Sequence, residues 1–352
     1  MEDKQKSDRL LSKVLDGRTL GFDESHELLT YLLTSTNDTS KQFADYLLAI
    51  HKRGETYEEI RALVELTKEV SLPINIEAGD STIIDVSGTG GSSIKTINVS
   101  TISAIALAAL GYMVPKQSNF AGTGITGSAD VFQANGIDIA EINSDKLKSV
   151  LEEVGICPYF APMLSGQLRN ALGVVANYYM NNPSPVKSIF HLGAFIYSPI
   201  KMGYRVYGCY SKDHLEIISQ LLYENGQTKT TVVHGHGGLP EASNFGKTTI
   251  LWRDGDKTRE ETVGPEDFGL QRCEVEEIES LNEKKNLALF TDIISGKETG
   301  PYRDLCLANI AVALVVLGRA SNLKEGADIA RSAFEKGLVE RKFKELVKRF
   351  DS

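Results

Sequence analysis

The sequence predicts an α/β protein with a separate small all-α N-terminal domain and a mostly parallel central sheet flanked by helices. Two observations carry this prediction: residues 8–70 show apolar residues at helical spacing only, whereas β-branched runs alternate with helical stretches from residue 82 onward. Such alternation is typical of parallel strands joined by helices. The 352 residues suffice for two domains. We expect 1–73 to be the helical domain, with helices around 165–185 as candidates to complete it, and 74–352 the α/β domain.

Four short helices are expected before residue 71. Apolar residues recur at helical spacing in the segments 10–15, 28–33 and 43–50. The third segment ends in two cations followed by Gly54, as helix C-termini commonly do. Thr56 and Glu59 have the spacing of a capping box, which predicts a fourth helix through Val70.

The second part of the chain alternates between two periodicities. The expected strands are 82–86, 112–115, 204–208, 230–235 and 248–252, and the expected helices between them are 101–110, 128–136 and 143–154. The acidic stretch 255–284 is expected to be a surface excursion. The tail 303–349 predicts three helices, with breaks near Gly318, Gly326 and Gly337.

Composition narrows the class of protein. The net charge is −9 and basic residues are scattered, which disfavours a nucleic-acid partner. The longest apolar run, Leu305–Leu317, contains Asn309 and is too short to span a bilayer, so we expect a buried helix and no membrane partner. Four widely spaced cysteines indicate neither a disulfide framework nor a zinc site. With no apolar N-terminal signal, these features favour a cytoplasmic protein.

The stretch 85-DVSGTGGSSIKTINVST-101 carries the first functional signal. A strand, a glycine-rich turn and a helix that begins near Asn98 form an anion-binding arrangement, because glycine lets backbone N–H groups approach a ligand and the helix N-terminus adds positive potential. Asn98, Ser100 and Thr101 add side-chain donors. The turn fits neither the Walker loop nor the Rossmann fingerprint. A tight turn with Ser and Thr capping is the alternative.

A second glycine-rich stretch follows, 116-KQSNFAGTGITGSADVFQANGI-137. Lys116 lies just past an expected strand end, and Gly122, Gly124 and Gly127 follow it. Ligands of open α/β sheets bind at the carboxyl ends of strands. Two such turns with one lysine between them therefore predict a cradle for a polyphosphate; two surface loops and a solvated lysine are the alternative.

The motifs recur along nearly the whole chain in an order that resembles one known family. The GTGG turn with 98-NVST-101 is similar to that family's GTGGD…NIST, Lys116 and Asn119 match the first and fourth positions of its KHGNR, and 127-GSAD-130 matches its SGSAD. Further similar segments are 47–60, 265–270, 295–309 and 323–331. The family is anthranilate phosphoribosyltransferase, within the class (glycosyltransferase family 3) that also holds the pyrimidine nucleoside phosphorylases.

The resemblance implies an enzyme, a pentosyltransferase that joins 5-phosphoribosyl 1-pyrophosphate to a nitrogen nucleophile with Mg²⁺ as cofactor. It implies an active site in the cleft between the two domains and a homodimer formed through the helical domain. Lys116 and Glu241 would be catalytic, and Ser100 and Glu241 would hold the metal. The residues that would bind the phosphates or substrate are Gly88, Thr89, Gly90, Gly91, Ser92, Asn98, Ser100, Thr101, Lys116, Asn119 and Ser128.

Several positions depart from the family pattern. Ser92 stands where the family has Asp after GTGG, and residues 116–120 read KQSNF in place of KHGNR. In 237-GGLPEAS-243, Glu241 remains of the family's acidic pair, but Pro240 replaces the aspartate. A single carboxylate predicts a weakened magnesium site.

The acceptor side differs further. Val175 or Ala176 takes the place of the family's arginine that meets anthranilate's carboxylate, and 194-AFIYSP-199 replaces its GPLTNP loop. Losing that charge-assisted pair predicts an acceptor other than anthranilate. Arg169 and Lys187 are the two candidates to substitute for the missing cation.

Three alternatives stay open at this point. One is a nucleoside or nucleotide phosphorylase, which needs the phosphate cradle but no acidic metal pair. Another is a catalytically inactive homologue that binds a ligand. The third concerns His234 and His236, which alternate on an expected strand and share a face, as a metal pair would; no third ligand has suitable spacing.

Overall fold

The computed structural model describes residues 2–36, 38–120, 126–181, 187–280 and 282–350. The chain divides into two compact units: residues 1–73 with 161–199, and residues 74–160 with 200–352. Within the described part of the chain, no helix combines the length and the apolar character needed to cross a membrane.

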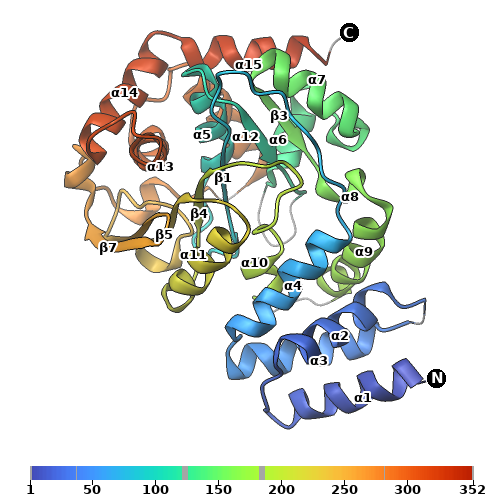
Figure 1. The fold of residues 1–352 in the computed structure, drawn as a ribbon. Helices are drawn as coiled ribbons and strands as arrows, with labels where there is room; N and C mark the ends of the chain where they lie inside the picture. Colours follow the sequence, from blue (N-terminus) through green and yellow to red (C-terminus); the bar gives the residue numbers. More distant parts are fainter. Residues whose placement is uncertain (1, 37, 121–125, 182–186, 281, 351–352) are drawn as a thin grey trace. The chain divides into compact units, whose positions relative to one another are not determined.

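The first unit begins with the four expected helices, which are confirmed. They are α1 (Glu2–Leu15), α2 (Phe22–Thr34), α3 (Ser40–Arg53) and α4 (Tyr57–Glu69), coloured blue in Figure 1. Gly54 ends α3 at a φ of 98°, a left-handed conformation that favours glycine. The capping box of α4 is present: the Thr56 N–H donates to Glu59 Oε2 at 3.0 Å, and the Glu59 N–H donates to Thr56 Oγ1 at 3.4 Å.

Three later helices belong to the same unit: α8 (Ala161–Leu164), α9 (Gly166–Asn181) and α10 (Ile189–Gly193). Helix α9 packs against α2 and α3, and α10 packs against α4. The ring of Phe43 on α3 meets Tyr178 of α9 and Phe190 of α10 edge to face, at 6.0 and 5.4 Å between centroids. A Cβ at Gly193 would lie 3.1 Å from Ile60 Cγ2, so glycine there permits the close approach of α10 to α4.

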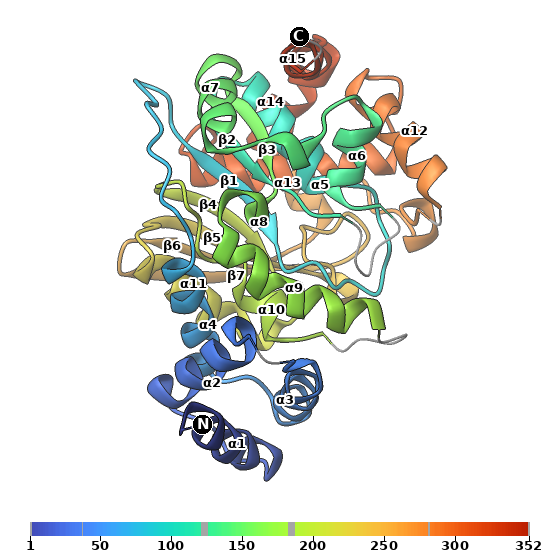
Figure 2. The ribbon, with the colours of Figure 1, turned by 90° about the vertical axis from the view of Figure 1, so that its right-hand side faces the viewer.

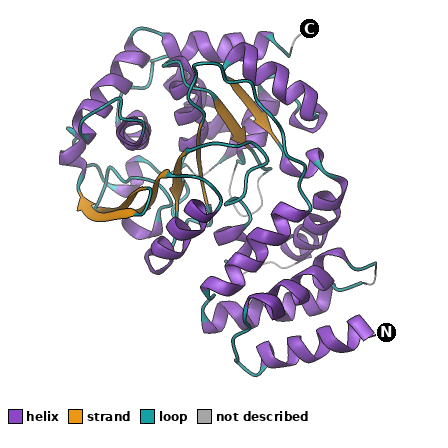
Figure 3. Ribbon diagram, viewed as in Figure 1, coloured by secondary structure: helices purple, strands orange, loops and turns teal. Residues whose placement is uncertain are grey.

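The second unit is built on a five-stranded sheet with the order β1-β4-β5-β6-β7. Strands β1, β4 and β5 are parallel to one another, and β6 and β7 are antiparallel additions. Figure 3 draws the strands in orange. A separate parallel pair joins β2 and β3. The strands are β1 (Ile84–Gly88), β2 (Val114–Gln117), β3 (Ile156–Tyr159), β4 (Tyr204–Gly208), β5 (Lys229–Gly235), β6 (Thr248–Asp254) and β7 (Lys257–Val263). All the expected strands are found, with small differences at their ends.

Two strands were not expected from the sequence. Strand β3 is buried at every position and contains Pro158, so it shows neither alternation nor an uninterrupted β-branched run. Strand β7 lies in the acidic stretch that we expected to be a surface excursion. Residues 257–263 are mostly exposed, but they form a strand that the sequence did not predict. They pair with β6 through a turn at Gly255, and most of their side chains are exposed, which removes the apolar signal of a strand.

Helices flank the sheet of the second unit. Helices α5 and α13 pack against each other, α5 against β1, and α13 against β4 and β5, while α11 packs against β5 and β6 (Figure 2). The helices are α5 (Val99–Ala109), α6 (Ser128–Ala134), α7 (Ser144–Val154), α11 (Leu215–Glu224), α12 (Glu283–Ile294), α13 (Pro301–Val316), α14 (Leu323–Glu335) and α15 (Leu338–Lys348). Short 3₁₀ segments are η1 (Ile139–Glu141), η2 (Lys212–His214), η3 (His236–Gly238), η4 (Pro265–Phe268) and η5 (Val275–Glu277).

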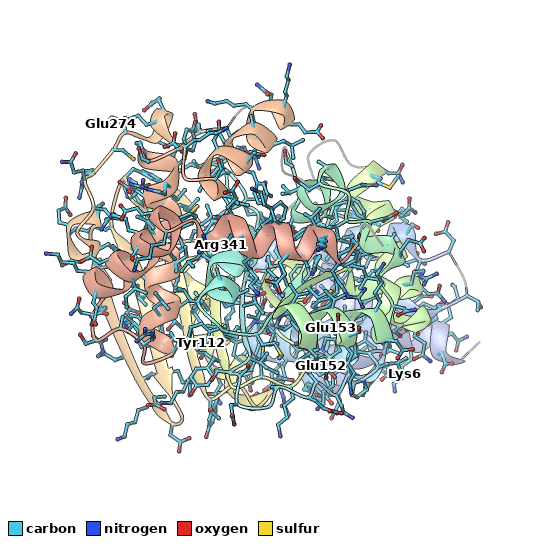
Figure 4. All side chains as sticks on the ribbon, turned by 90° about the horizontal axis from the view of Figure 1, so that it is seen from above. Lys6, Tyr112, Glu152, Glu153, Glu274 and Arg341 are labelled. Atoms are coloured by element: carbon cyan, nitrogen blue, oxygen red, sulfur yellow. The ribbon has the colours of Figure 1, made fainter. Side chains whose placement is uncertain are left out.

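The C-terminal tail forms the three expected helices, α13 to α15. Gly318 and Gly337 lie at the breaks, but Gly326 lies inside α14, contrary to expectation. A Cβ at Gly326 would come within 2.8 Å of Ala311 Cα, so this glycine serves the packing of α14 on α13. Helix α15 packs against α7, on which Glu153 is labelled in Figure 4. Arg349, just past the end of α15, forms an ion pair with Glu153 at 2.7 Å.

Candidate functional site

A cavity of about 150 Å³ lies in the second unit, among the ends of β1, β4 and β5 and the first turns of α5. It brings together four residues predicted from the sequence: Gly88, Gly90, Ser100 and Glu241. Three further polar residues line it that the sequence analysis assigned no role, namely Ser87, Ser103 and Asn309. The position agrees with the rule that ligands of parallel sheets bind at the carboxyl ends of strands.

Backbone geometry explains the glycines of the turn. Gly90 and Gly91 have φ values of 61° and 73°, in the left-handed region where a side chain is strained. A Cβ at Gly88 would lie 2.8 Å from the Gly208 carbonyl oxygen, so β1 and β4 approach too closely for another residue. Thr89 ties the turn to the end of β4: its N–H donates to Gly208 O at 2.8 Å, and its hydroxyl accepts from the Tyr210 N–H at 3.1 Å.

The other hydroxyl and amide groups of the turn differ in what they face. The Ser92 hydroxyl accepts from the Ile94 N–H at 3.1 Å and so stabilises the turn itself. Asn98 occupies the N-cap position of α5 without a side-chain capping bond, and it donates through Nδ2 to Thr126 O at 3.0 Å. Thr101 is fully buried, away from the cavity lining, whereas Ser100 faces the cavity. The first turn of α5 therefore presents one hydroxyl and the positive end of a helix dipole.

Charged groups gather beneath the turn. Asp85 and Arg205 are cross-strand neighbours on β1 and β4, nearly inaccessible to solvent, and they form an ion pair at 2.8 Å. Lys116, on β2, is 3% exposed and donates to Val86 O at 3.2 Å. Burial lowers the pKa of Lys116, and the nearby Arg205 adds to this effect, while Asp85 and Glu241 oppose it. The lysine is thus a buried side chain held against the middle of β1, and not a solvated surface residue.

Glu241 is the only carboxylate among the described residues that line the cavity. Burial raises its pKa to about 7, against the opposing field of Lys116. Its neighbour Pro240 lies directly on β4, since a Cβ at Gly208 would lie 1.6 Å from the Pro240 carbonyl oxygen. Gly208 therefore has to be glycine for the loop to sit where it does.

The second glycine-rich stretch is organised differently. The Asn119 N–H donates to Ser128 Oγ at 3.1 Å, and Asn119 O accepts from the Ala129 N–H at 3.0 Å, so the loop is tied to the start of α6. Phe120 is 40% exposed and meets Phe160 edge to face at 5.7 Å, just beyond the ends of β2 and β3. Gly122 and Gly124 of the predicted cradle lie outside the described residues.

The two candidate metal-binding histidines have different environments. His234 Nδ1 lies 2.9 Å from Cys209 O, and His236 lies in η3 with its ring 5.6 Å from that of Phe245. Within the described ranges, no cluster of three or more His, Cys, Asp or Glu side chains is placed to hold a metal ion.

Comparison with known proteins decides the family. The family model described as glycosyl transferase family, a/b domain, matches residues 80–339. The chain belongs to this family. Anthranilate phosphoribosyltransferases from Petrotoga mobilis and Bacillus mycoides are 31% and 32% identical to it over 337 residues, which cover 96% of this chain and 95% and 96% of theirs. The resemblance inferred from the motifs is confirmed, and the chain is a transferase of the phosphoribosyltransferase-like kind.

Solved structures agree on the fold. The anthranilate phosphoribosyltransferase of Thermus thermophilus superposes with a TM-score of 0.83 at 26% identity, covering 97% of this chain and 99% of its own. The Saccharomyces cerevisiae enzyme, in complex with PRPP and Mg, gives 0.84 at 22% identity, with 98% of both chains covered. The predicted fold class is therefore confirmed.

On the expected acceptor side, the chain departs from the anthranilate phosphoribosyltransferase pattern at residues 175–176 and 194–199, and these positions belong to the first unit. Val175 is buried in α9, whereas Ala176 and Arg169 are exposed two turns apart on the same helix face. Arg169 is thus the nearest cation along that face, while Lys187 follows the segment 182–186, which lies outside the described residues.

Some residues that line the cavity, and a buried ion pair near it, were not predicted from the sequence because their signals were weak. Ser103 lies one turn beyond Ser100 on the same helix face, at a spacing that could have been noticed. Asn309 is the single amide in the apolar run 305–317. Asp85 and Arg205 could be paired only once β1 and β4 were known to be neighbours.

Proposed function

We propose that this chain transfers the phosphoribosyl group of 5-phosphoribosyl 1-pyrophosphate to a nitrogen nucleophile other than anthranilate. The observation that carries the proposal is the cavity at the ends of β1, β4 and β5, where a glycine turn, the N-terminus of α5 and Glu241 converge. Backbone N–H groups and a helix N-terminus favour phosphate, and the reaction needs stabilisation of charge on departing pyrophosphate.

Each predicted residue has a role in this proposal. The backbone of Gly88 to Gly91 wraps the pyrophosphate, with Thr89 and Ser92 fixing the shape of the turn through their hydroxyls. Ser100 donates from the first turn of α5. Lys116, which donates to Val86 O on β1, would stabilise the charge of the pyrophosphate when it is protonated. Asn98, Thr101, Asn119 and Ser128 complete the proposed set of phosphate- or substrate-binding residues; Asn98 is also bonded to Thr126, and Asn119 to Ser128.

The oxygen donors fit a magnesium ion. Glu241 and Ser100 face the same cavity, and Mg²⁺ prefers one or two carboxylates together with phosphate oxygens and water. Glu241 and Ser100 would hold the ion, which would neutralise charge on the leaving pyrophosphate. Pro240 removes the second carboxylate, so metal coupling is expected to be weaker than with an acidic pair.

The acceptor is proposed from the aromatic pair beyond β2 and β3. Phe120 occupies the position at which the family motif ends in arginine, and its exposed ring packs against Phe160. Aromatic faces suit an uncharged planar ring and give no charge-assisted bond to a carboxylate. We therefore infer a neutral aromatic or heteroaromatic nitrogen nucleophile.

The remaining proposals concern organisation. The all-α domain comprises residues 1–73, completed by helices of the segment 161–199, and the rest forms the donor-binding domain. We propose a homodimer formed through the all-α domain, a cytoplasmic location, and no nucleic-acid or membrane partner.

A nucleoside or nucleotide phosphorylase is the second candidate, favoured by Pro240. A phosphorylase uses inorganic phosphate, for which the glycine turn and Lys116 suffice without a second metal carboxylate.

Calorimetry with 5-phosphoribosyl 1-pyrophosphate, with and without Mg²⁺, tests the proposal. Metal-enhanced binding is expected for a transferase. If the donor binds in neither condition, the proposal is contradicted. The remaining alternative is then a catalytically inactive homologue that binds a different ligand. Metal-independent binding together with phosphate-dependent cleavage of a nucleoside would favour the phosphorylase.

A further inference from the structure

The loop that carries Glu241 lies directly on the backbone of two strands. A Cβ at Gly208 would lie 1.6 Å from the Pro240 carbonyl oxygen, and a Cβ at Gly235 would lie 2.2 Å from the Glu241 carbonyl oxygen. Since real Cβ atoms never approach so closely, glycines on β4 and β5 are what allow the loop to settle there. These contacts place the loop against β4 and β5.

Asn309, on helix α13, is hydrogen-bonded to the same loop. Its Oδ1 accepts from the Ala242 N–H at 2.8 Å, and its Nδ2 donates to Ala242 O at 3.0 Å and to Leu305 O at 2.8 Å. The backbone N–H and C=O of Ala242 are thus both hydrogen-bonded by the Asn309 side chain, as they would be by the backbone of a neighbouring strand. Asn309 is 9% exposed, on a helix whose residues from Leu305 to Leu314 are otherwise apolar and buried.

Burial of an amide at this point has an energetic consequence. An Asn in an apolar helix is disfavoured unless it is fully hydrogen-bonded, and removing it would leave the Ala242 N–H and C=O without their partner. Packing alone would be served equally well by leucine. The amide therefore acts on the loop, and the loop's one functional side chain is Glu241, which lines the cavity together with Asn309.

We propose that Asn309 is the positioning residue for Glu241: it fixes the backbone at Ala242 so that the single carboxylate of the cavity faces the metal-binding position. This inference rests on the proposed function for its chemistry. With Pro240 in place of a second carboxylate, no other acid among the described residues that line the cavity can replace a displaced Glu241, so its placement matters more here than where two carboxylates share the ion.

A double-mutant cycle tests the coupling. Asn309→Leu should lower the Mg²⁺-dependent gain in 5-phosphoribosyl 1-pyrophosphate affinity about tenfold and change metal-free affinity less than about twofold. In a Glu241→Gln background, the same substitution should change neither quantity. Equal losses in both backgrounds, or equal losses with and without metal, would overturn the proposal.

Two further variants guard against simple misfolding. Asn309→Asp keeps an acceptor for the Ala242 N–H but turns a carboxylate oxygen toward the Ala242 and Leu305 carbonyl oxygens, so it should lose at least as much of the metal-dependent gain as leucine does. Asn286→Leu is the matched control, because Asn286 is also buried, on α12, and does not line the cavity. It should leave the metal-dependent gain unchanged.

Hydrogen exchange of the segment 239–243 separates the inference from the proposed function, because it requires no ligand. Asn309→Leu should accelerate exchange there about tenfold, and Asn286→Leu should not. If the wild-type protein fails to bind the donor but exchange is accelerated, the proposed function falls and Asn309 still holds the loop. Unchanged exchange in Asn309→Leu overturns the positioning role whatever the protein binds.

Discussion

The two glycine-rich turns of the second unit look alike in sequence and differ in structure. The turn after β1 places Gly88 and Gly90 in the lining of the cavity and ties itself to β4 through backbone and hydroxyl contacts. The stretch after β2 binds its own polar groups to one another and leaves the ring of Phe120 exposed.

Under the proposed function, the two turns would recognise different groups. A phosphate held by backbone N–H groups would require one backbone conformation, which the glycines and their close contacts permit. A single substitution can change which ligand a side chain binds. Phe120 is an example, because the family motif has arginine at this position. The donor side is thus expected to be intolerant of backbone changes, and the acceptor side to be open to alteration.

The largest expected effect comes from closing the space above β4. In Gly208→Ala the new Cβ meets the Pro240 carbonyl, which must move and carry Glu241 with it. We expect the metal-dependent donor affinity to fall about 100-fold, close to 3 kcal/mol, by calorimetry. Gly203→Ala is the control, since its Cβ has no neighbour nearer than 3.9 Å. Equal behaviour of the two variants would contradict the close-contact argument.

Removing the buried cation should have the next largest effect. Lys116→Met keeps the side-chain length but loses the charge, so donor affinity should fall about 10- to 100-fold. The pKa of Glu241 should also rise above about 7, because the lysine field now lowers it. Lys257→Met, on exposed β7, should change neither. Wild-type affinity in Lys116→Met would remove the residue from the site.

The acceptor side should respond more weakly and independently of the donor. Phe120→Ala loses an aromatic contact, so the affinity of an uncharged aromatic acceptor should fall about 2- to 12-fold while donor affinity stays unchanged. Phe120→Arg should instead favour acceptors that carry a carboxylate. Competition binding with matched charged and neutral ligands measures both, with Phe350→Ala as a remote control. A loss of donor affinity in Phe120→Ala would show that the two sides are not separate.

The smallest effect is expected at Ser92, where the family has aspartate. Ser92→Asp retains an acceptor for the Ile94 N–H and adds a carboxylate, so the metal-dependent gain in donor affinity should rise about threefold. Ser93→Asp adds the same charge one residue later and tests whether position matters. If both variants raise the metal-dependent gain equally, the added negative charge alone explains the gain, and the position of residue 92 does not matter.

Local features of the fold were predictable because their causes are local. The capping box of Thr56 and Glu59 depends on four consecutive residues, and the turn with Gly90 and Gly91 depends on conformations that glycine alone adopts readily. Strand β7 was missed because its side chains are exposed and polar, and it is a strand only through its pairing with β6. Gly326 was misread for a similar reason, since its role is contact with α13.

The sequence by itself determined the family, the division into a helical part and an α/β part, and the glycine turn that would hold phosphate. Only the tertiary structure decided which polar groups face the cavity. It placed Ser100 at the cavity and Thr101 in the core, and buried Lys116 beneath the turn. It also joined Ala242 to Asn309, 67 residues apart. Periodicity and capping act between near neighbours in the chain, whereas the direction of a side chain and its partners depend on which distant elements pack together.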